Sequence, residues 1–278
     1  MSLEEYLTNW NLTDPQLLAQ TPTSYVYTVL HEGEQRVLKL LTAYGWEERS
    51  GAVALRHWNG QGAIHVYEFD QNAQLLEYAS GDELVTLVER GDDAQATHII
   101  AGVLKQLHSI PYNGNSEGLF LLDRWFQELF KRAEADQQSG VNSLFVRGAA
   151  VVRELLAHPR DVRVLHGDIH HRNIRQSERG WLALDPKGLV GERTYDLANT
   201  LVNPYPYTEL VHNEKRLLTN AGILADELAL DFPRVLAFIY AYSCLSAAWS
   251  LAPGEDETGA ANWAIKVAQI VEPHLHLA

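Results

Sequence analysis

Residues 164–188, VLHGDIHHRNIRQSERGWLALDPKG, constrain the fold of this chain more than any other segment. Four polar residues of the segment lie within 20 positions of one another: His166, Asp168, Asn173 and Asp185. The apolar runs RVLHG and WLALD flank most of the polar stretch, which predicts two strands joined by a loop. The loop can hold Asp168 and Asn173 on one side of a site, while the second strand delivers Asp185 from the other.

The spacing of these residues resembles the catalytic loop of protein kinases, in which His-Arg-Asp is followed by four residues and an Asn. Here His166-Gly167-Asp168 is followed by four residues and Asn173, and Asp185 comes twelve residues later. Phosphoryl transfer needs a carboxylate near the acceptor hydroxyl, which orients the hydroxyl and takes its proton. It also needs oxygen ligands for Mg²⁺, which bridges the phosphates and neutralises developing charge. The segment can supply both.

Two other interpretations of the segment are open at this point. One is a metal hydrolase, whose potential ligands are His166, Asp168, His170 and His171. That interpretation leaves Asn173 and Asp185 without a role, and the segment lacks a second group of histidines beside it. The other is a solvated loop without chemistry, but the two apolar runs around so many uncommon residues favour a functional site.

A lysine in the N-terminal part of the chain supplies the cation that nucleotide phosphates require. Lys39 lies in VLKLL, an otherwise apolar predicted strand, as the lysine of the kinase motif V-A-I-K does. A lysine in a strand is more often an exposed edge residue, but Lys39 precedes a predicted helix over 46–58 that offers an ion-pair partner. Glu48 is preferred for that role because of its spacing to Leu55, and Glu47 is a near-equal alternative.

The pattern around Lys39 predicts a small antiparallel sheet that carries one helix. Two strand-like runs within Tyr25–Leu41 are joined by HEGEQ, a polar connection typical of a hairpin. The helix over 46–58 follows, and then the β-rich runs AIHVYEF and QLLEYA. After Gly81 helical spacing dominates, apart from the two strands of the polar segment. We therefore expect an α/β (α+β) chain with two lobes, residues 1–79 and 80–278.

Further segments carry a resemblance to a known family. With its HGD-xxxx-N and DPK motifs, the chain resembles the aminoglycoside phosphotransferase family of small-molecule kinases. The segments 185–204, 54–64 and 245–256 are similar to the branch of streptomycin 6-phosphotransferases and hydroxyurea phosphotransferases. The resemblance extends from about residue 24 to the C-terminus. It implies a bilobal protein-kinase-like fold, with a small antiparallel-sheet lobe and a mainly α-helical lobe.

The resemblance also implies roles for individual residues. Asp168 would be the catalytic base, and Asn173 and Asp185 would be the Mg²⁺ ligands. Lys39 would contact the ATP phosphates and pair with Glu48. The remaining assignments are adenine recognition by backbone groups of Glu77 and Ala79, and structural support of the catalytic loop by His166 and Asp196.

One segment departs from the protein-kinase pattern. Protein kinases cover the phosphates with a glycine-rich loop, whereas the matching stretch here, TPTSYVYTV, contains no glycine. Backbone or hydroxyl groups near Thr23 and Ser24 are expected to bind the nucleotide instead.

The expected reaction is transfer of the γ-phosphoryl group of ATP to a hydroxyl of a small molecule. A cationic aminoglycoside such as streptomycin suits the net charge of −14 and the acidic stretch GEDET at 254–258, although GEDET also suits an exposed loop. The same charge argues against nucleic acid as a partner. A catalytically silent nucleotide-binding protein and a kinase for an unrelated metabolite are the alternatives.

The remaining composition predicts a cytoplasmic protein with no membrane partner. One cysteine, Cys244, allows no intrachain disulfide, and the N-terminus lacks the basic and apolar regions of a signal peptide. The uncharged stretch Val235–Gly254 is diluted by Ser and Tyr, which favours a buried helix over a membrane span.

Overall fold

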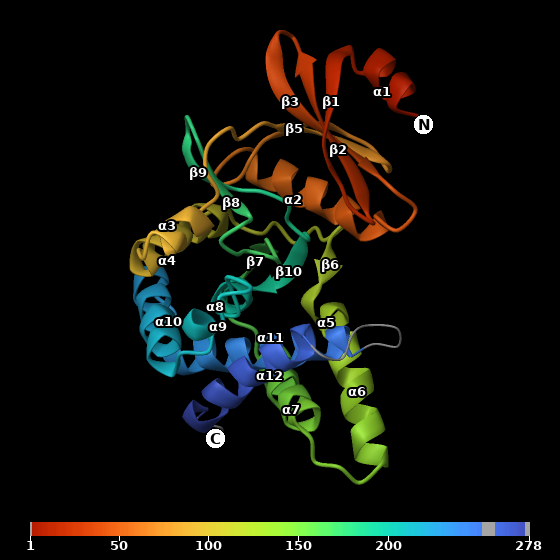
Figure 1. Cartoon of the computed structure of the whole chain (residues 1–278). Coiled ribbons are helices and arrows are strands. Elements are labelled where there is room, and N and C mark those ends of the chain that lie inside the picture. The colour runs from red at the N-terminus through yellow and green to blue at the C-terminus, as the bar shows by residue number, and fades with distance from the viewer. Residues whose placement is uncertain (1, 252–258, 276–278) are drawn as a thin grey trace.

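A five-stranded antiparallel sheet forms the N-terminal part of the molecule (Figure 1). The computed structural model describes residues 2–251 and 259–275, so the predicted GEDET segment lies outside the described residues. The strands of the sheet, in spatial order, are β1 (Leu12–Gln20), β2 (Ser24–His31), β3 (Glu34–Leu41), β5 (Ala73–Glu77) and β4 (Val66–Phe69).

The predicted hairpin joins β2 and β3. Its turn residues Glu32 and Gly33 have φ values of 54° and 82°, and two positive φ angles match the right-handed twist of the flanking strands. Lys39 pairs with Val26 in this register, which puts the lysine in the middle of the sheet. Helix α1 (Leu3–Asn9) begins with the capping box formed by Ser2 and Glu5 and precedes the sheet.

The edge strand β1 was not predicted, because its sequence lacks the signals of a strand. Its residues are almost all exposed, so no alternation of apolar and polar side chains marks the segment. It contains Asp14, whose φ is 51°, and Pro15, and its pairing with β2 shifts register twice. Proline and bulges are tolerated at a sheet edge, where one side of the backbone has no ladder to maintain.

Helix α2 (Arg49–Trp58) lies between the sheet and the helical part, and it follows the 3₁₀ helix η1 (Trp46–Glu48) (Figure 1). Small residues let the first turn of α2 contact the chain that follows β9 (Gly180–Ala183). A Cβ atom on Gly51 would lie 2.3 Å from the carbonyl oxygen of Pro186, and one on Gly188 would lie 2.2 Å from that of Ser50. The Ser50 hydroxyl also donates a hydrogen bond of 2.6 Å to the carbonyl oxygen of Lys187.

Most of the rest of the chain is helical. The described residues contain ten α-helices in this part, α3 to α12. They are α3 (Val85–Glu89), α4 (Asp93–His108), α5 (Leu122–Trp125), α6 (Gln127–Gln138), α7 (Leu144–Ala157), α8 (Asp196–Leu201), α9 (Thr208–Val211), α10 (Glu214–Leu228), α11 (Phe232–Ser250) and α12 (Ala260–Val271). Helix α11, which carries no charged residue after Arg234, is buried on several faces against α7, α8 and α12, as predicted. Among the described residues no helix is long and apolar enough to cross a membrane.

Small strands interrupt the helices beside the polar segment. They are β6 (Phe120–Leu121), β7 (Val162–Leu165), β8 (Ile174–Ser177), β9 (Gly180–Ala183) and β10 (Leu189–Glu192). Strands β7 and β9 confirm the two predicted runs. Helical spacing also marks residues 119–136, but this stretch contains β6, and its helices α5 and α6 are separated at Phe126. The prediction of a small antiparallel sheet followed by a mainly helical remainder is confirmed.

Candidate active site

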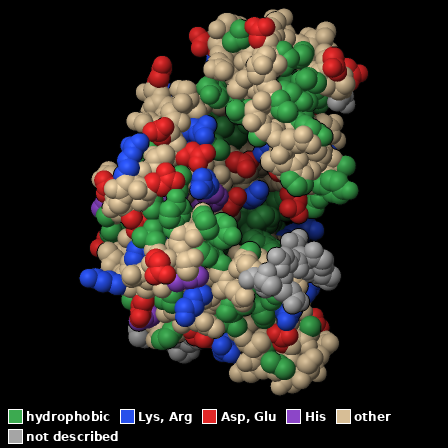
Figure 2. Space-filling model, in the orientation of Figure 1, with side chains coloured by type: hydrophobic (Ala, Val, Ile, Leu, Met, Phe, Trp, Pro, Cys, Tyr) green, Lys and Arg blue, Asp and Glu red, His purple; other side chains and the backbone are tan. Residues whose placement is uncertain are grey.

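A cavity of about 400 Å³, here called the cleft cavity, lies between the sheet and the helical part. Aliphatic side chains from β2, β3, β5 and the neighbouring loops form its walls: Val26, Val37, Ile64, Leu76 and Leu184. Its polar lining includes Thr21, Thr23, Ser24, Lys39 and Asp185. In Figure 2, acidic and basic side chains gather where the two parts of the molecule meet. A cavity with apolar walls and a few convergent polar groups is typical of a ligand site.

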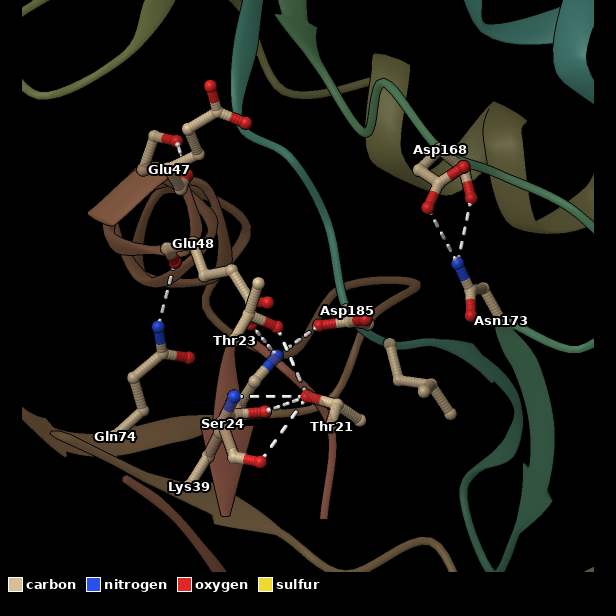
Figure 3. Close-up of polar contacts among 12 residues, drawn as sticks. Thr21, Thr23, Ser24, Lys39, Glu47, Glu48, Gln74, Asp168, Asn173 and Asp185 are labelled. Atoms are coloured by element: carbon tan, nitrogen blue, oxygen red, sulfur yellow. Dashed lines mark hydrogen bonds and ion pairs between the residues drawn. The ribbon is translucent and has the colours of Figure 1, made fainter. Parts of the chain in front are cut away.

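Lys39 is buried in this cavity and forms ion pairs with both Glu48 and Asp185 (Figure 3). Burial disfavours its charge, but the two carboxylates outweigh that effect and raise the pKa of Lys39. Asp185 is likewise opposed by burial, yet Lys39 and Lys187 lower the pKa of its carboxyl. Glu47 points away from this group and lines a different cavity. Of the two neighbouring glutamates, Glu48 is therefore the partner of the lysine.

Hydroxyl groups replace glycines at the rim of the cleft cavity. The Thr21 hydroxyl lies 3.1 Å from the hydroxyls of both Thr23 and Ser24, and it accepts a hydrogen bond of 3.0 Å from the Ser24 amide. These bonds hold the turn before β2 in one conformation without a glycine. Thr21, Thr23 and Ser24 therefore line the cavity from a hydrogen-bonded turn.

The strand end at 77–79 borders the opposite side of the cleft cavity. The Glu77 amide donates to the carbonyl oxygen of His65, and its carboxylate binds Arg179, so neither of these groups is free for a ligand. Ala79 lines the cavity, and neither of its backbone groups has a partner among the described residues. An adenine edge needs one acceptor and one donor of this kind.

Asp168 lies in the loop after β7, where two amides hold its carboxylate. Asn199 donates a hydrogen bond of 2.7 Å to one carboxylate oxygen, and Asn173 donates a bond of 3.4 Å to the other. Burial raises the pKa of Asp168 to about 7, although Lys187 and the two amides oppose that shift. A carboxylate with a pKa near neutrality is suited to accept a proton. Asn199 was missed by the sequence analysis because one amide within a helix has no spacing signal.

His166 and Asp196 support this loop from below. The Asp196 carboxylate accepts hydrogen bonds from the amides of His166 and Gly167 at 3.0 and 2.8 Å, and from the His108 ring at 2.9 Å. One His166 ring nitrogen contacts the carbonyl oxygen of Leu184, and the other accepts from the Asp168 amide. Burial lowers the pKa of His166 to about 4, so its ring is neutral at physiological pH.

The oxygen atoms that could bind a metal come from two segments, the loop before β8 and the chain after β9. Figure 3 shows Asp168 and Asn173 facing each other, while the Asp185 carboxylate turns toward Lys39. Asn173 uses its amide nitrogen on Asp168, which leaves its amide oxygen for a cation. An amide oxygen and a carboxylate are the donor types that Mg²⁺ accepts, with phosphates and water completing its shell. The two residues therefore fit Mg²⁺.

The zinc-hydrolase interpretation finds no such fit. Both ring nitrogens of His166 are hydrogen-bonded, and His171 is buried near Arg216 and Asp93. Within residues 2–251 and 259–275, no three His, Cys, Asp or Glu side chains are grouped so as to hold a metal ion. His166 thus supports the loop through both ring nitrogens and has neither of them free for a metal.

A second cavity of about 620 Å³, here called the aromatic cavity, lies beside the first. Its rings form a chain of contacts, with centroids 5.8 Å apart for Trp46 and Phe120, 5.9 Å for Phe120 and Trp125, and 5.4 Å for Trp125 and Trp249. Its charged lining residues are Glu47, Arg124, Glu128 and Lys187. The sequence analysis did not predict this cavity, because scattered tryptophans are more often core residues.

Comparisons with known proteins agree with this geometry. A family model described as aminoglycoside/hydroxyurea antibiotic resistance kinase matches residues 9–254. A streptomycin 3''-kinase of Klebsiella pneumoniae is 36% identical over 250 residues, which cover 88% of this chain and 91% of that protein. A hydroxyurea phosphotransferase of Kitasatospora aureofaciens is 32% identical over 262 residues, 90% of this chain and 73% of that protein.

Solved structures share the fold at low sequence identity. An aminoglycoside phosphotransferase, APH(4)-Ia, in complex with ADP and hygromycin B has a TM-score of 0.65 at 13% identity, covering 98% of both chains. A choline/ethanolamine kinase family protein from Mesorhizobium loti has a TM-score of 0.65 at 16% identity, covering 93% of this chain and 88% of the other. The predictions of a protein-kinase-like fold and of a phosphotransferase acting on a small-molecule hydroxyl are confirmed. The chain belongs to the family of aminoglycoside/hydroxyurea antibiotic resistance kinases.

Proposed function

We propose that this enzyme transfers the γ-phosphoryl group of ATP to a hydroxyl of streptomycin or a closely similar cationic aminoglycoside. The observation that carries the proposal is that one cation, Lys39, and one carboxylate, Asp168, are each held in place by neighbouring side chains. Lys39 is held by Glu48 and Asp185 on the sheet side, and Asp168 is held by Asn199 on the helical side. In this assignment residues 1–79 form the nucleotide lobe and residues 80–278 carry the catalytic loop and the acceptor site.

ATP binds in the cleft cavity in this proposal. The aliphatic walls cover the adenine, backbone groups of Glu77 and Ala79 meet its edge, and Ser24 and Lys39 bind the phosphates. Asn173 and Asp185 would hold Mg²⁺, which supplies positive charge beside the phosphates. His166 and Asp196 keep the catalytic loop in place through the hydrogen bonds described above.

The reaction follows from the position of Asp168. Its carboxylate orients the acceptor hydroxyl and takes its proton as the hydroxyl oxygen attacks the γ-phosphorus. The bond between that phosphorus and the bridging oxygen breaks, and the electron pair leaves with ADP. The products are the phosphorylated acceptor, ADP and one proton, which Asp168 releases to solvent.

The aromatic cavity is the acceptor site in this proposal. Cations bind over aromatic faces, and three tryptophans together with Phe120 line the cavity. The carboxylates of Glu47 and Glu128 add negative charge to its wall. Streptomycin, which the names of three relatives mention, is a cationic compound with several hydroxyls. An ATP-dependent reaction on such a compound suits a cytoplasmic enzyme without a nucleic-acid partner.

The direct test is phosphorylation of streptomycin by the purified enzyme with Mg²⁺ and ATP, measured as ADP release and as product mass. We expect Asp168→Asn to lower kcat by about 10³-fold, because the variant loses the proton acceptor. Asp226→Asn, on the exposed surface of α10, is the matched control and keeps full activity.

Equal transfer by the wild type and Asp168→Asn would refute the assigned base. Nucleotide binding without turnover, on streptomycin, other aminoglycosides, hydroxyurea or choline, would instead identify a catalytically silent protein. Turnover of another acceptor but not of streptomycin would correct the substrate and leave the kinase mechanism in place.

A further inference from the structure

Lys187 lies where the two cavities meet. It lines the cleft cavity with Lys39 and Asp185, and it also lines the aromatic cavity. Of the described residues that line these two cavities, Lys187 is the one common to both. A group that passes from a donor in one cavity to an acceptor in the other passes this side chain.

The backbone fixes Lys187 at this position through main-chain contacts. Its amide donates a hydrogen bond of 2.7 Å to the carbonyl oxygen of His166, and its carbonyl oxygen accepts one of 2.6 Å from the Ser50 hydroxyl. Pro186, the residue before Lys187, has its own φ fixed by the proline ring. None of these contacts uses the ammonium group, so the side chain can be changed while the loop keeps its anchors.

The ammonium groups of Lys187 and Lys39 differ in their ion-pair partners. Lys39 is neutralised by two carboxylates, whereas the ammonium of Lys187 forms no ion pair with any described residue. Lys187 is nevertheless close enough to Asp168 and Asp185 for its charge to lower the pKa of both carboxyls. An unpaired cation between two acids and two cavities is available for a third anion.

We propose that Lys187 is a catalytic residue that stabilises the negative charge of the phosphoryl group during its transfer between the two cavities. The proposal rests on the proposed function, since it requires ATP in the cleft cavity and a hydroxyl in the aromatic cavity. Lys187 forms no covalent bond and takes up no proton from the substrate, because the proton of the acceptor goes to Asp168. The phosphorus exchanges its bond to ADP for a bond to the acceptor oxygen beside the ammonium.

This role predicts an effect on turnover rather than on binding. A fixed cation aimed at the position where charge develops acts mainly in the transition state, while Lys39 and the cavity walls hold the ground state. Removal of one such group typically lowers kcat by about 10²- to 10³-fold. The affinity for the bound substrates should change little.

The experiment compares Lys187→Met and Lys187→Arg with the wild type. We expect Lys187→Met to lower kcat for streptomycin by about 10²-fold or more, and Lys187→Arg to stay within about tenfold of the wild type. The affinities for a non-hydrolysable ATP analogue and for streptomycin should stay within about threefold in both variants. Lys105→Met, which removes an exposed lysine of α4 that lines neither cavity, is the matched control with unchanged kinetics.

A second measurement separates charge stabilisation from structural support. ADP with Mg²⁺ and fluoroaluminate mimics the phosphoryl group in transit, and the affinity of Lys187→Met for it should fall in parallel with kcat. Unchanged kcat, or a loss confined to nucleotide affinity, would overturn the role of Lys187 while the wild type still phosphorylates streptomycin. Failure of the wild type to phosphorylate any acceptor would refute the proposed function instead.

Discussion

The two cavities that share Lys187 are lined by different types of residue. The cleft cavity has aliphatic walls, backbone groups and hydroxyls, and its central lysine is neutralised by two carboxylates. The aromatic cavity has four rings in sequential contact and charged groups of both signs at its edges. One wall of the aromatic cavity, Trp46 and Glu47, comes from the same 3₁₀ turn as Glu48, which faces the cleft cavity.

This difference reflects the different requirements of ATP binding and acceptor binding. ATP binding requires a cation, a slot for adenine and oxygen ligands for a metal, and in the proposed assignment these come from residue types that have fixed spacing in the sequence. Recognition of the acceptor requires only a complementary shape and charge, which many sequences provide. Perturbing each cavity separately should therefore affect different kinetic constants.

The largest effect is expected from removal of the buried cation. In Lys39→Met, Glu48 and Asp185 lose their shared partner, and the loss of one member of a buried pair typically costs about 3–5 kcal/mol of unfolding free energy. The side chain of Asp185 is part-exposed, so we expect the lower end of that range. Chemical denaturation should show this loss, and kcat/KM for ATP should fall about 10²-fold or more.

A double variant distinguishes the stabilising role of Lys39 from its role toward nucleotide. Lys39→Met with Glu48→Gln removes the uncompensated charge, so part of the lost unfolding free energy should return. Activity should not return with it, because the cation for the phosphates is still missing. Recovery of both properties would mean that Lys39 serves the fold alone.

A smaller effect should mark the aromatic cavity. Trp46 is 53% exposed and lines that cavity, and we expect Trp46→Ala to raise KM for streptomycin about tenfold through loss of a cation–π contact. KM for ATP should be unchanged. Tyr44, two residues earlier and 78% exposed, lines neither of the two cavities, so Tyr44→Ala is the matched control. Equal behaviour of the two variants would remove the aromatic cavity from acceptor binding.

The smallest effect is expected from Asn199, whose removal should shift the pH dependence of kcat/KM. Asp168 must be ionised to take a proton, so kcat/KM should rise with pH through the pKa of about 7 of this group. The hydrogen bond from Asn199 stabilises the carboxylate and lowers that pKa, so Asn199→Ala should move the acidic limb to higher pH. At pH 7 this variant should lose about two- to fivefold in rate.

The control for this shift is Asn142→Ala, an exposed residue before α7 whose side chain has no contact with Asp168. Its pH profile should overlay that of the wild type. A profile of Asn199→Ala that is lower at every pH but unmoved along the pH axis would mean that Asn199 supports the loop without tuning the base.

The sequence was informative where chemistry demands residue types at fixed spacing. The strands around the polar segment and the hairpin that contains Lys39 follow from local patterns and are present in the structure. The preference for Glu48 over Glu47 rested on helical spacing, and the ion pair with Lys39 forms at Glu48. Each of these features is decided within about ten residues of chain.

Features that depend on distant residues were not predictable. Strand β1 has no burial pattern of its own and is defined by its pairing with β2. Asn199 reaches Asp168 across 31 positions, and Trp46 meets Phe120 across an even longer separation. A side chain that acts through tertiary contact alone has the same local sequence as one that packs in the core.

The contact between α2 and the chain after β9 has a consequence for regulation. In many protein kinases the helix that carries the partner of the lysine swings outward, and that movement switches the enzyme off. Here Gly51 and Gly188 allow the backbone of α2 to contact the backbone after β9, and the Ser50 hydroxyl donates a hydrogen bond to the Lys187 carbonyl oxygen. An outward movement of α2 would break this hydrogen bond and leave a gap between the two segments. We therefore expect the pair of Lys39 and Glu48 to stay formed in the absence of substrate. The rate of the reaction would then depend on the concentrations of the enzyme and of its substrates.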